Sequence, residues 1–406
     1  MPPRSKRRRL TDPTEDHSHE ICQPATQSQK GSWNGFCEIE SEPALFNVML
    51  REFGVKGAKV QEVISLDEEM MAFLHQPIYG LIFLFRWRED DTDKQEATCP
   101  DGLWFANQTA DNACASVALL NIVNNIPDID LGENLQHFKD FTRNFTPALR
   151  GDAVNNFEFV KRIHNSFARK MDILNSDLQL KSEARSKKRS KGQDAGETDA
   201  TFHFIAFMPA MGQLWKFDGL ERQPQALGEC SQDDWLELAR PNLVARMAAY
   251  EEEQIEFSIL GVVRDPLPGL IQQLADNVRG LEVLTSRVME ENPNDIEAMM
   301  SGLPETVLGP DPSYDLTREV IDTATVSKEV SKILSSQSSL AEVQQRLQEL
   351  IAEQRELLKN IREEQQSQRT DEDHATGRRY DYGPAVRTWL RFLAHKQLLG
   401  ELLQGK

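Results

Sequence analysis

The chain has 406 residues, of which 39% are hydrophobic and 27% are charged, so it can form a large folded domain with polar segments beside it. Its formal net charge of −19 argues against a generally basic nucleic-acid binder and favours a basic protein or peptide as partner. No apolar run reaches the roughly 18 residues of a membrane span, and no apolar leader is visible, so we expect neither membrane insertion nor a signal peptide. The five cysteines form no Cys-x-x-Cys pair, which favours reduced thiols inside a cell, and we expect no metal and no cofactor.

The first 31 residues are polar and contain several prolines, so we expect a disordered arm. Its basic run at residues 4–9 is a candidate nuclear-import signal. A second basic run at residues 187–191 is either another such signal or charge that keeps a loop soluble. The expected locations are therefore the cytoplasm and the nucleus.

Residues 32–265 have the pattern of one folded domain that mixes helices and strands. Helical apolar spacing covers residues 44–53 and 111–124. Short apolar runs predict strands at residues 79–87, 201–207, 214–217 and 255–263. Because no strand-helix-strand rhythm connects these runs, the predicted fold class is α+β and not a doubly wound parallel sheet. Residues 181–200 lack large apolar side chains, which is typical of a functional or disordered loop.

From residue 266 onward the chain becomes helical and polar. Residues 266–315 read as one amphipathic helix, centred on residues 270–288, followed by a proline-rich linker. Residues 316–406 read as a helical C-terminal domain.

Within that domain, apolar side chains recur at steps of three and four, with polar Gln354 at one of the repeating positions. We predict a heptad helix over residues 324–368, which packs either on its own domain or on a partner helix. Gly377 is expected to end this region, and a terminal amphipathic helix is predicted over residues 384–403.

Four polar residues form a candidate acyl-transfer site. Cys114 is the candidate nucleophile because it begins a predicted helix, where free N–H groups and the helix dipole favour a thiolate. His203, on a predicted strand, is the candidate general base and acid. Asp218 ends the next predicted strand and can orient the His203 ring if the two strands pair. Gln108, six residues before the cysteine, is the candidate oxyanion donor together with the Cys114 N–H. Each residue alone is more often structural, such as a buried core thiol.

Five short stretches resemble the ubiquitin C-terminal hydrolases, which are papain-like cysteine peptidases. They are residues 80–85 (GLIFLF), 108–114 (QTADNAC), 164–169 (HNSFAR), 202–204 (FHF) and 217–220 (FDGL). The resemblance spans about residues 33–264 and keeps the order Gln, Cys, His, Asp.

The resemblance implies a central antiparallel sheet flanked by helices, with a knotted backbone and an active-site crossover loop at residues 181–200. It implies ubiquitin and ubiquitinated proteins as partners, because family members accept the extended, basic tail of ubiquitin. Cys114 would be acylated by the terminal glycine of ubiquitin, and water activated at His203 would hydrolyse the acyl-enzyme.

The C-terminal region resembles the long, proteasome-associated branch of this family. The resemblance lies in Arg378, Arg379 and Tyr380, in Tyr382 and Pro384, and in the final amphipathic helix. A nuclear tumour-suppressor branch has a similar tail but a much longer insert before it. The resemblance therefore implies a proteasomal receptor subunit as partner for the tail, with Trp389 as the expected anchor.

Three alternatives stay open at this stage. The chain could be a ubiquitin-binding scaffold that acts through its C-terminal helices, with weak or lost catalysis. It could be a nuclear, chromatin-associated deubiquitinase of the same family. A third reading, an acyl-transferring Cys-His-Asp enzyme of the transglutaminase type, fits the triad but not the flanking strings.

Overall fold

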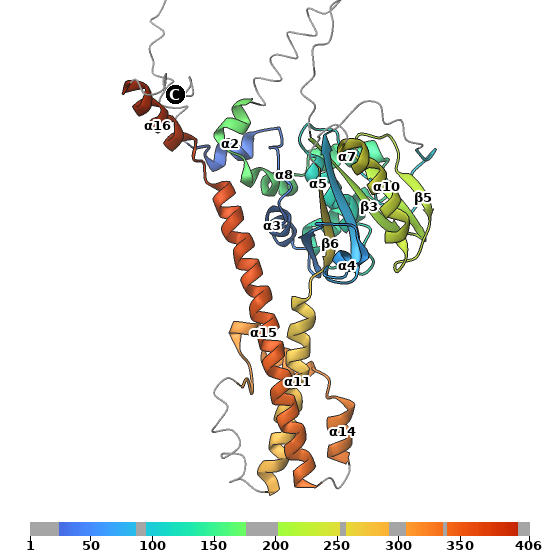
Figure 1. Ribbon diagram of the computed structural model, residues 1–406, viewed down its shortest axis with the longest axis vertical. Coiled ribbons are helices and arrows are strands. Elements are labelled where there is room, and N and C mark those ends of the chain that lie inside the picture. Colours follow the sequence, from blue (N-terminus) through green and yellow to red (C-terminus); the bar gives the residue numbers. More distant parts are fainter. Residues whose placement is uncertain are drawn as a thin grey trace, which may run out of the picture.

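A six-stranded antiparallel sheet forms the centre of the molecule (Figure 1). The computed structural model describes residues 24–86, 95–175, 202–251, 257–291, 306–335 and 339–396. In spatial order the strands are β1 (Ala58–Glu62), β6 (Ser258–Arg264), β2 (Ile78–Arg86), β3 (Phe202–Ala210), β4 (Gln213–Asp218) and β5 (Gln225–Glu229). The four predicted strands are present, and the α+β fold class is confirmed. The short strands β1 and β5 were not predicted, because AKVQE and QALGE carry few of the apolar residues that mark a strand.

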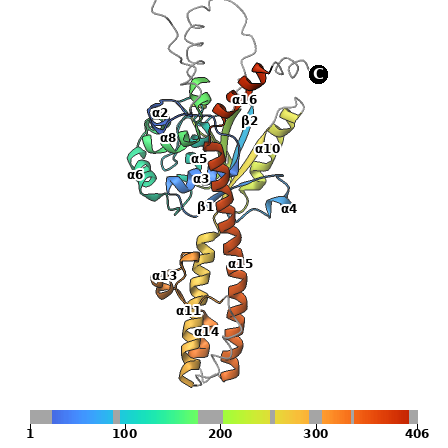
Figure 2. The same ribbon diagram turned by 90° about the vertical axis from the view of Figure 1, so that its left-hand side faces the viewer.

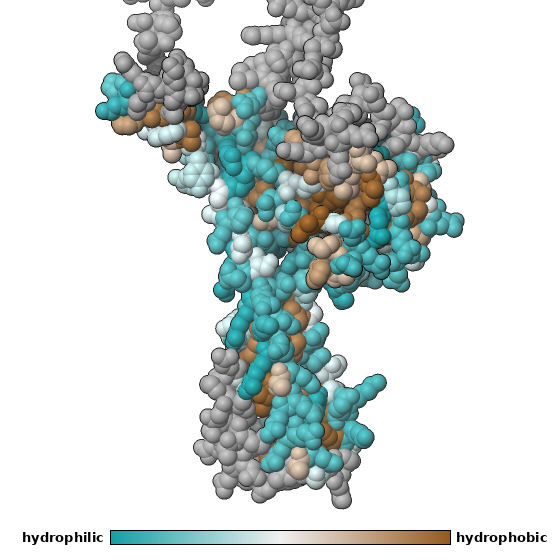
Figure 3. Space-filling model, viewed as in Figure 1, coloured by the Kyte–Doolittle hydropathy of each residue, from teal (hydrophilic) through white to brown (hydrophobic). Residues whose placement is uncertain are grey.

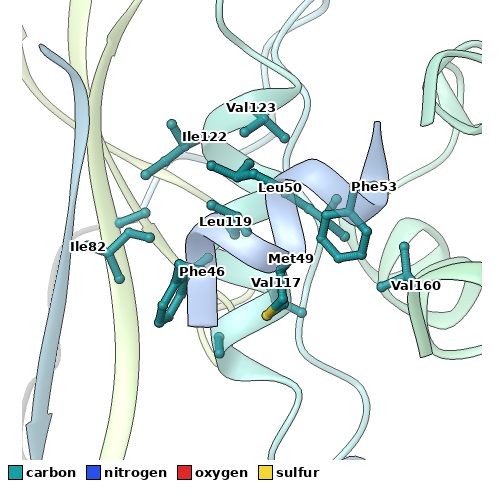
Figure 4. Packing of buried hydrophobic residues seen from close by; sticks show 14 of the residues in the cluster. Phe46, Met49, Leu50, Phe53, Ile82, Val117, Leu119, Ile122, Val123 and Val160 are labelled. Carbon is teal, nitrogen blue, oxygen red and sulfur yellow. The ribbon is translucent and has the colours of Figure 1, made fainter. Parts of the chain in front are cut away.

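Helices cover both faces of the sheet. On one face, Ile82, Phe204 and Leu260 pack with α3 (Pro43–Phe53) and α5 (Cys114–Val123), as Figure 4 shows for part of this core. On the other face, alternate residues of the same strands pack with α10 (Trp235–Glu251). The apolar runs of the central strands are therefore nearly continuous, because both sides are buried. Each fully buried side chain, such as Phe46, contributes roughly 1.5–3 kcal/mol.

Both predicted helices of this region are present. Gly54 ends α3 in the left-handed conformation, with a φ of 88°. The remaining short helices of the sheet body are α2 (Gln27–Ser32), α4 (Glu68–Met71), α6 (Gly132–Thr142), α7 (Pro147–Asn155), α8 (Glu158–His164) and the 3-10 turn η1 (Asn165–Phe167).

A short helix lies within the range predicted as a disordered arm. Residues 1–23 lie outside the described residues, but residues 27–32 are helical because Thr26 and Gln29 form a capping box. Lys30 also donates to the carbonyl oxygen of Ser166 at 2.8 Å, which ties α2 to η1. The boundary at residue 31 is therefore wrong. The predicted crossover loop at residues 181–200 lies outside the described residues.

Two long helices project from the sheet body as an arm (Figures 1 and 2). We call α11 (Leu267–Glu291), α13 (Arg318–Thr323), α14 (Lys328–Ser335) and α15 (Leu340–Arg379) the helical arm. The predicted apolar heptad stripe of α15 packs within the molecule, against α11 and α14. A partner helix is therefore not needed to cover it. None of the described helices is long and apolar enough to cross a bilayer.

The heptad helix differs from its predicted range of 324–368 at both ends. It begins at Leu340 because Ser339 and Glu342 form a capping box. It continues past Gly377, the predicted break, to Arg379. The polar second half of α15 stays helical because it lies along the sheet body, where Ala375 joins the main apolar core.

Gln354 explains the polar position of the stripe. Its side chain is 1% exposed, accepts from the N–H of Val307 at 2.8 Å, and donates to the carbonyl of Val307 and to Asn277. Residues 306–315, predicted as part of a linker, are therefore attached to the arm. Residues 312–314 form a 3-10 turn whose Tyr314 is buried.

The terminal helix α16 (Gly383–His395) begins near its predicted start, and residues 397–403 lie outside the described residues. Leu393 is buried, whereas Val386, Trp389 and Leu390 are exposed. Figure 3 shows apolar side chains on this helix, which lies at the upper left of the view. Its predicted apolar stripe is therefore largely uncovered within the described part of the chain.

Candidate active site

Cys114 is the first residue of α5, as predicted. A tight turn leads into the helix, and Asn112 adopts a φ of 60° there, which asparagine tolerates better than most residues. The thiol is partly exposed and lines a cleft of about 480 Å³ together with Asn112. The free N–H groups of the first helical turn and the positive end of the helix dipole lie at this position.

His203 and Asp218 come together through the pairing of β3 with β4. Ile205 is opposite Asp218 in the register, so His203 lies one step further along the same side of β3. The ring Nε2 and the carboxylate Oδ1 are 2.7 Å apart. His203 is 4% exposed and Asp218 is 7% exposed, so water competes little for this hydrogen bond.

Burial and hydrogen bonding oppose each other at His203. Burial lowers the pKa of the ring, but the hydrogen bonds to Asp218 and to Cys114, together with the negative charges of both partners, raise its pKa to about 9. Burial likewise favours a raised pKa for Asp218, but His203, the N–H of Leu220 and the charge of Lys216 hold that pKa below its usual value. The site therefore favours a protonated His203 ring beside an ionised Asp218 carboxylate.

Gln108 approaches the same group from an extended segment. Its backbone N–H donates to the carbonyl of Gly219 at 2.8 Å, immediately after Asp218. Gly219 packs closely at this contact, since a Cβ there would lie 3.0 Å from the Cβ of Gln108. Among the residues that the structure describes, the Oε1 atom of Gln108 is buried without a hydrogen-bond partner. The structure thus brings all four predicted site residues into one region.

Charged side chains surround the cleft beside Cys114. Glu38, Glu40 and Asp172 contribute carboxylates, while Arg169 and Arg378 contribute guanidinium groups. No local spacing in the sequence predicts these charged residues at the site, although Arg169 belongs to the family stretch at residues 164–169. Arg378 stood out only as part of the tail pattern, and no local spacing connects it with Cys114.

A buried histidine supports the helix that carries Cys114. His164 is fully buried, and its ring makes hydrogen bonds with Ser116 Oγ at 2.8 Å and with the Cys37 carbonyl at 2.7 Å. Burial lowers the pKa of His164 to about 4, although the bond to Cys37 acts in the opposite direction. Burial also raises the pKa of the Cys37 thiol to about 12, so Cys37 is no alternative nucleophile. In the sequence, His164 belongs to the family stretch at residues 164–169, and no spacing indicates its contact with Ser116.

A thiol at a helix N-terminus, joined to a histidine that an aspartate orients, is the arrangement of a thiol hydrolase. Among the described residues, no group of three or more His, Cys, Asp or Glu side chains could hold a metal ion. Residues 36–248 match the family model described as ubiquitin carboxyl-terminal hydrolase, family 1. The chain belongs to this family and is a cysteine-type deubiquitinase.

Curated relatives extend the match beyond the family model. The chain is 35% identical over 269 residues to ubiquitin carboxyl-terminal hydrolase isozyme L5 of Dictyostelium discoideum, covering 66% of this chain and 70% of that protein. It is 32% identical over 292 residues to ubiquitin carboxyl-terminal hydrolase ubh-4 of Caenorhabditis elegans, covering 71% and 81%. Among solved structures, Trichinella spiralis UCH37 bound to ubiquitin vinyl methyl ester is 31% identical, with a TM-score of 0.46, covering 59% of this chain and 86% of that chain. The predicted resemblance to the long branch of the family is confirmed.

Proposed function

We propose that this deubiquitinase cleaves the peptide or isopeptide bond after the C-terminal glycine of ubiquitin, with Cys114 as nucleophile. The observation that carries the proposal is the contact of Cys114 with a buried His203, whose ring binds Asp218 at 2.7 Å. The Cys114 thiolate attacks the glycine carbonyl, and the His203 imidazolium donates its proton to the leaving amine. Water then attacks the thioester with His203 as base, which releases ubiquitin.

Two hydrogen-bond donors are proposed to hold the oxyanion of the tetrahedral intermediates. One is the Cys114 backbone N–H at the start of α5, and the other is the side-chain amide of Gln108. Donors fixed in place before the reaction stabilise charge as it develops, without reorganisation. The cleft acid Glu38 supports recognition of a basic tail, because opposite charges attract strongly where water is partly excluded, whereas Glu40 and Asp172 are paired with Arg378.

The test compares Cys114→Ala with Cys230→Ala, whose partly exposed thiol is the control. Cys114→Ala is expected to abolish release of a fluorogenic amine from the ubiquitin C-terminus while ubiquitin binding persists. Peptide mapping after reaction with a ubiquitin-tail electrophile is expected to find the adduct on Cys114. Turnover that persists in Cys114→Ala, or an adduct on another cysteine, would contradict the assignment. Absence of turnover and adduct in the unmodified chain would favour the scaffold alternative.

We also propose a proteasomal receptor subunit as the partner of α16. The exposed apolar residues Val386, Trp389 and Leu390 support a docked partner, because a short helix gains little stability in water without one. Trp389, which is 59% exposed, is the expected anchor. The similarity to isozyme L5, which continues beyond the family model, supports the choice of branch.

Trp389→Ala is expected to weaken co-purification with proteasomes at least about 30-fold, as loss of an interface hot spot of 2 kcal/mol does. Arg391→Ala, on the same helix, is the matched control and should retain binding. Hydrolysis of the small fluorogenic substrate is expected to stay unchanged in both variants. Proteasome association that survives Trp389→Ala, or capture of chromatin proteins instead, would refute this partner. A cytoplasmic and nuclear location remains part of the proposal, and import would be tested by replacing the basic residues at 7–9.

A further inference from the structure

An extended segment outside the sheet, residues 104–108, carries Gln108 into the site. Two asparagine side chains bind its backbone, Asn121 of α5 and Asn125 in the turn that follows this helix. Asn125 accepts from the Trp104 N–H at 2.8 Å and donates to its carbonyl at 2.6 Å. Asn121 accepts from the Ala106 N–H at 2.8 Å and donates to its carbonyl at 3.2 Å. One helical turn spans about 5.4 Å and two extended residues about 6.6 Å, so this pairing keeps the segment in register with the helix of Cys114.

The Asn107 side chain extends from this segment to the turn that follows Asp218. Its Nδ2 donates to the Glu221 carbonyl at 2.6 Å and to the Gly219 carbonyl at 3.3 Å. The Gly219 carbonyl also accepts from the Gln108 N–H. Asn107 therefore joins the segment that carries Gln108 to the turn that follows Asp218.

That turn also orients the carboxylate of the triad. The Glu221 N–H donates to the Asp218 carbonyl at 3.0 Å, and the Leu220 N–H donates to Asp218 Oδ1 at 3.0 Å. The same Oδ1 atom binds His203. These bonds hold the turn against the Asp218–His203 pair without Asn107, so loss of the Asn107 amide would displace the segment of Gln108 and not the turn.

Close packing holds Asn107 from behind. Its N–H donates to the Pro147 carbonyl at 3.0 Å, at the start of α7. In the same helix, Gly151 lies so near that a Cβ there would be 2.2 Å from the Asn107 carbonyl oxygen. The backbone at residue 107 thus has little room to move away, and its side chain is held against the turn after Asp218.

We propose that Asn107 is a positioning residue for deubiquitination, whose amide fixes Gln108 relative to the Asp218–His203 pair. The proposal depends on the proposed function, in which Gln108 donates to the oxyanion. Asn107 acts through Gln108 and touches no reacting atom. Displacements of about 1 Å at a catalytic group cost up to about 100-fold in rate, so the loss is expected in kcat and not in substrate binding.

The test is a double-mutant cycle of Asn107→Asp with Gln108→Ala. Aspartate keeps the size of Asn107 but has no donor and places a carboxylate against two carbonyl oxygens. With Gln108 present, Asn107→Asp is expected to lower kcat at least about tenfold with KM within about twofold. In the Gln108→Ala background the same change is expected to lower kcat by less than about twofold, since residues that act as a unit are not additive. Asn156→Asp, an exposed change of equal charge at the residue that follows α7, should leave kcat unchanged.

Equal losses of kcat in both backgrounds, or a loss confined to KM, would overturn the positioning role. Asn107→Ala, which removes the donor without adding charge, decides the question if Asn107→Asp does not fold. Its loss of kcat should likewise disappear in the Gln108→Ala background. If Gln108→Ala alone leaves kcat unchanged, Gln108 is not the oxyanion donor. The positioning role of Asn107 then fails as well, although its hydrogen bonds to the turn stand. If the unmodified chain fails to release ubiquitin, the proposed function itself fails.

Discussion

Arg378, in the last turn of α15, binds Glu40 in the wall of the active-site cleft, with Nε and Oε2 2.8 Å apart. The two residues are 338 positions apart in the sequence. Arg378 also donates to the Phe167 carbonyl at 2.8 Å and lies 3.6 Å from Asp172. Further ion pairs follow α15 along the sheet body, from Lys59 with Glu364 to Arg379 with Glu52.

Arg378→Ala is expected to lower the free energy of unfolding by about 1–3 kcal/mol, the range for a hydrogen bond to a charged group. The surface ion pair itself contributes less than about 1 kcal/mol, so the carbonyl contact dominates. Hydrogen exchange in residues 364–379 should accelerate. Arg369→Ala, at an exposed position of the same helix, is the control and should change neither quantity. Unaltered exchange in Arg378→Ala would show that the end of α15 is held by its other contacts.

Gln108→Ala is expected to lower kcat by about 10²–10³, the loss seen when one oxyanion donor is removed. KM should change little, because the donor acts on charge that develops in the transition state. Steady-state kinetics with a fluorogenic ubiquitin amide measures both constants. A variant that keeps full kcat would remove Gln108 from the mechanism.

Asp218→Asn is expected to move the alkaline limb of the pH–rate profile down by at least about one unit. Burial lowers the His203 pKa, but Asp218 and Cys114 together raise it to about 9, so removal of the carboxylate lets the imidazolium lose its proton at lower pH. Because this pKa exceeds the unfolded value of about 6.5, the stability it contributes is complete below pH 6.5 and is lost as pH rises through 9. That alkaline loss should shrink in Asp218→Asn, and an unchanged pH profile would contradict the assignment. Asp152→Asn, at an exposed position of α7, is the control.

His164 is expected to make the protein acid-sensitive. Its folded-state pKa of about 4 lies below the ordinary value of 6.5, so the unfolded chain binds the extra proton and stability falls as pH drops from 6.5 to 4. The slope from this residue is at most about 1.4 kcal/mol per pH unit. His164→Gln should be less stable at pH 7 but should lose less stability on acidification, as measured by urea unfolding at several pH values. An equal slope in both proteins would place the acid sensitivity elsewhere.

Gln354→Leu is expected to destabilise the arm, although leucine is a common residue at heptad core positions. The change leaves the partly buried Val307 N–H and carbonyl, and the buried Asn277 side chain, without their bonds to the amide. Such losses cost roughly 1–3 kcal/mol per buried group. Gln366→Leu, at an exposed position of α15, is the control. Urea unfolding that shows a gain in stability for Gln354→Leu would contradict the proposed role of these bonds.

Local patterns in the sequence were sufficient to predict the α+β class, the central strands, and the helices that contain Phe46 and Cys114. These features depend on side-chain periodicity and on helix ends, which a short stretch of sequence encodes. The four candidate site residues could be selected for the same reason. Their residue types suit acyl transfer, and the spacing of His203 and Asp218 matches two paired strands.

Tertiary structure decided the features that depend on contacts between distant segments. The extension of α15 beyond Gly377 requires the sheet body beside it, because its polar second half has no apolar stripe of its own. In the sequence, Gln354 looks like a polar interruption of the heptad, and its role becomes clear only from its hydrogen bonds with Val307. Arg378 looks like one charge of the tail, and only the fold shows its ion pair with Glu40. Asn107 has no local pattern at all. Its position between Gly151 and the turn after Asp218 arises only when three separate segments pack together, since hydrogen bonds to backbone carbonyls leave no signature in the partner's side chains.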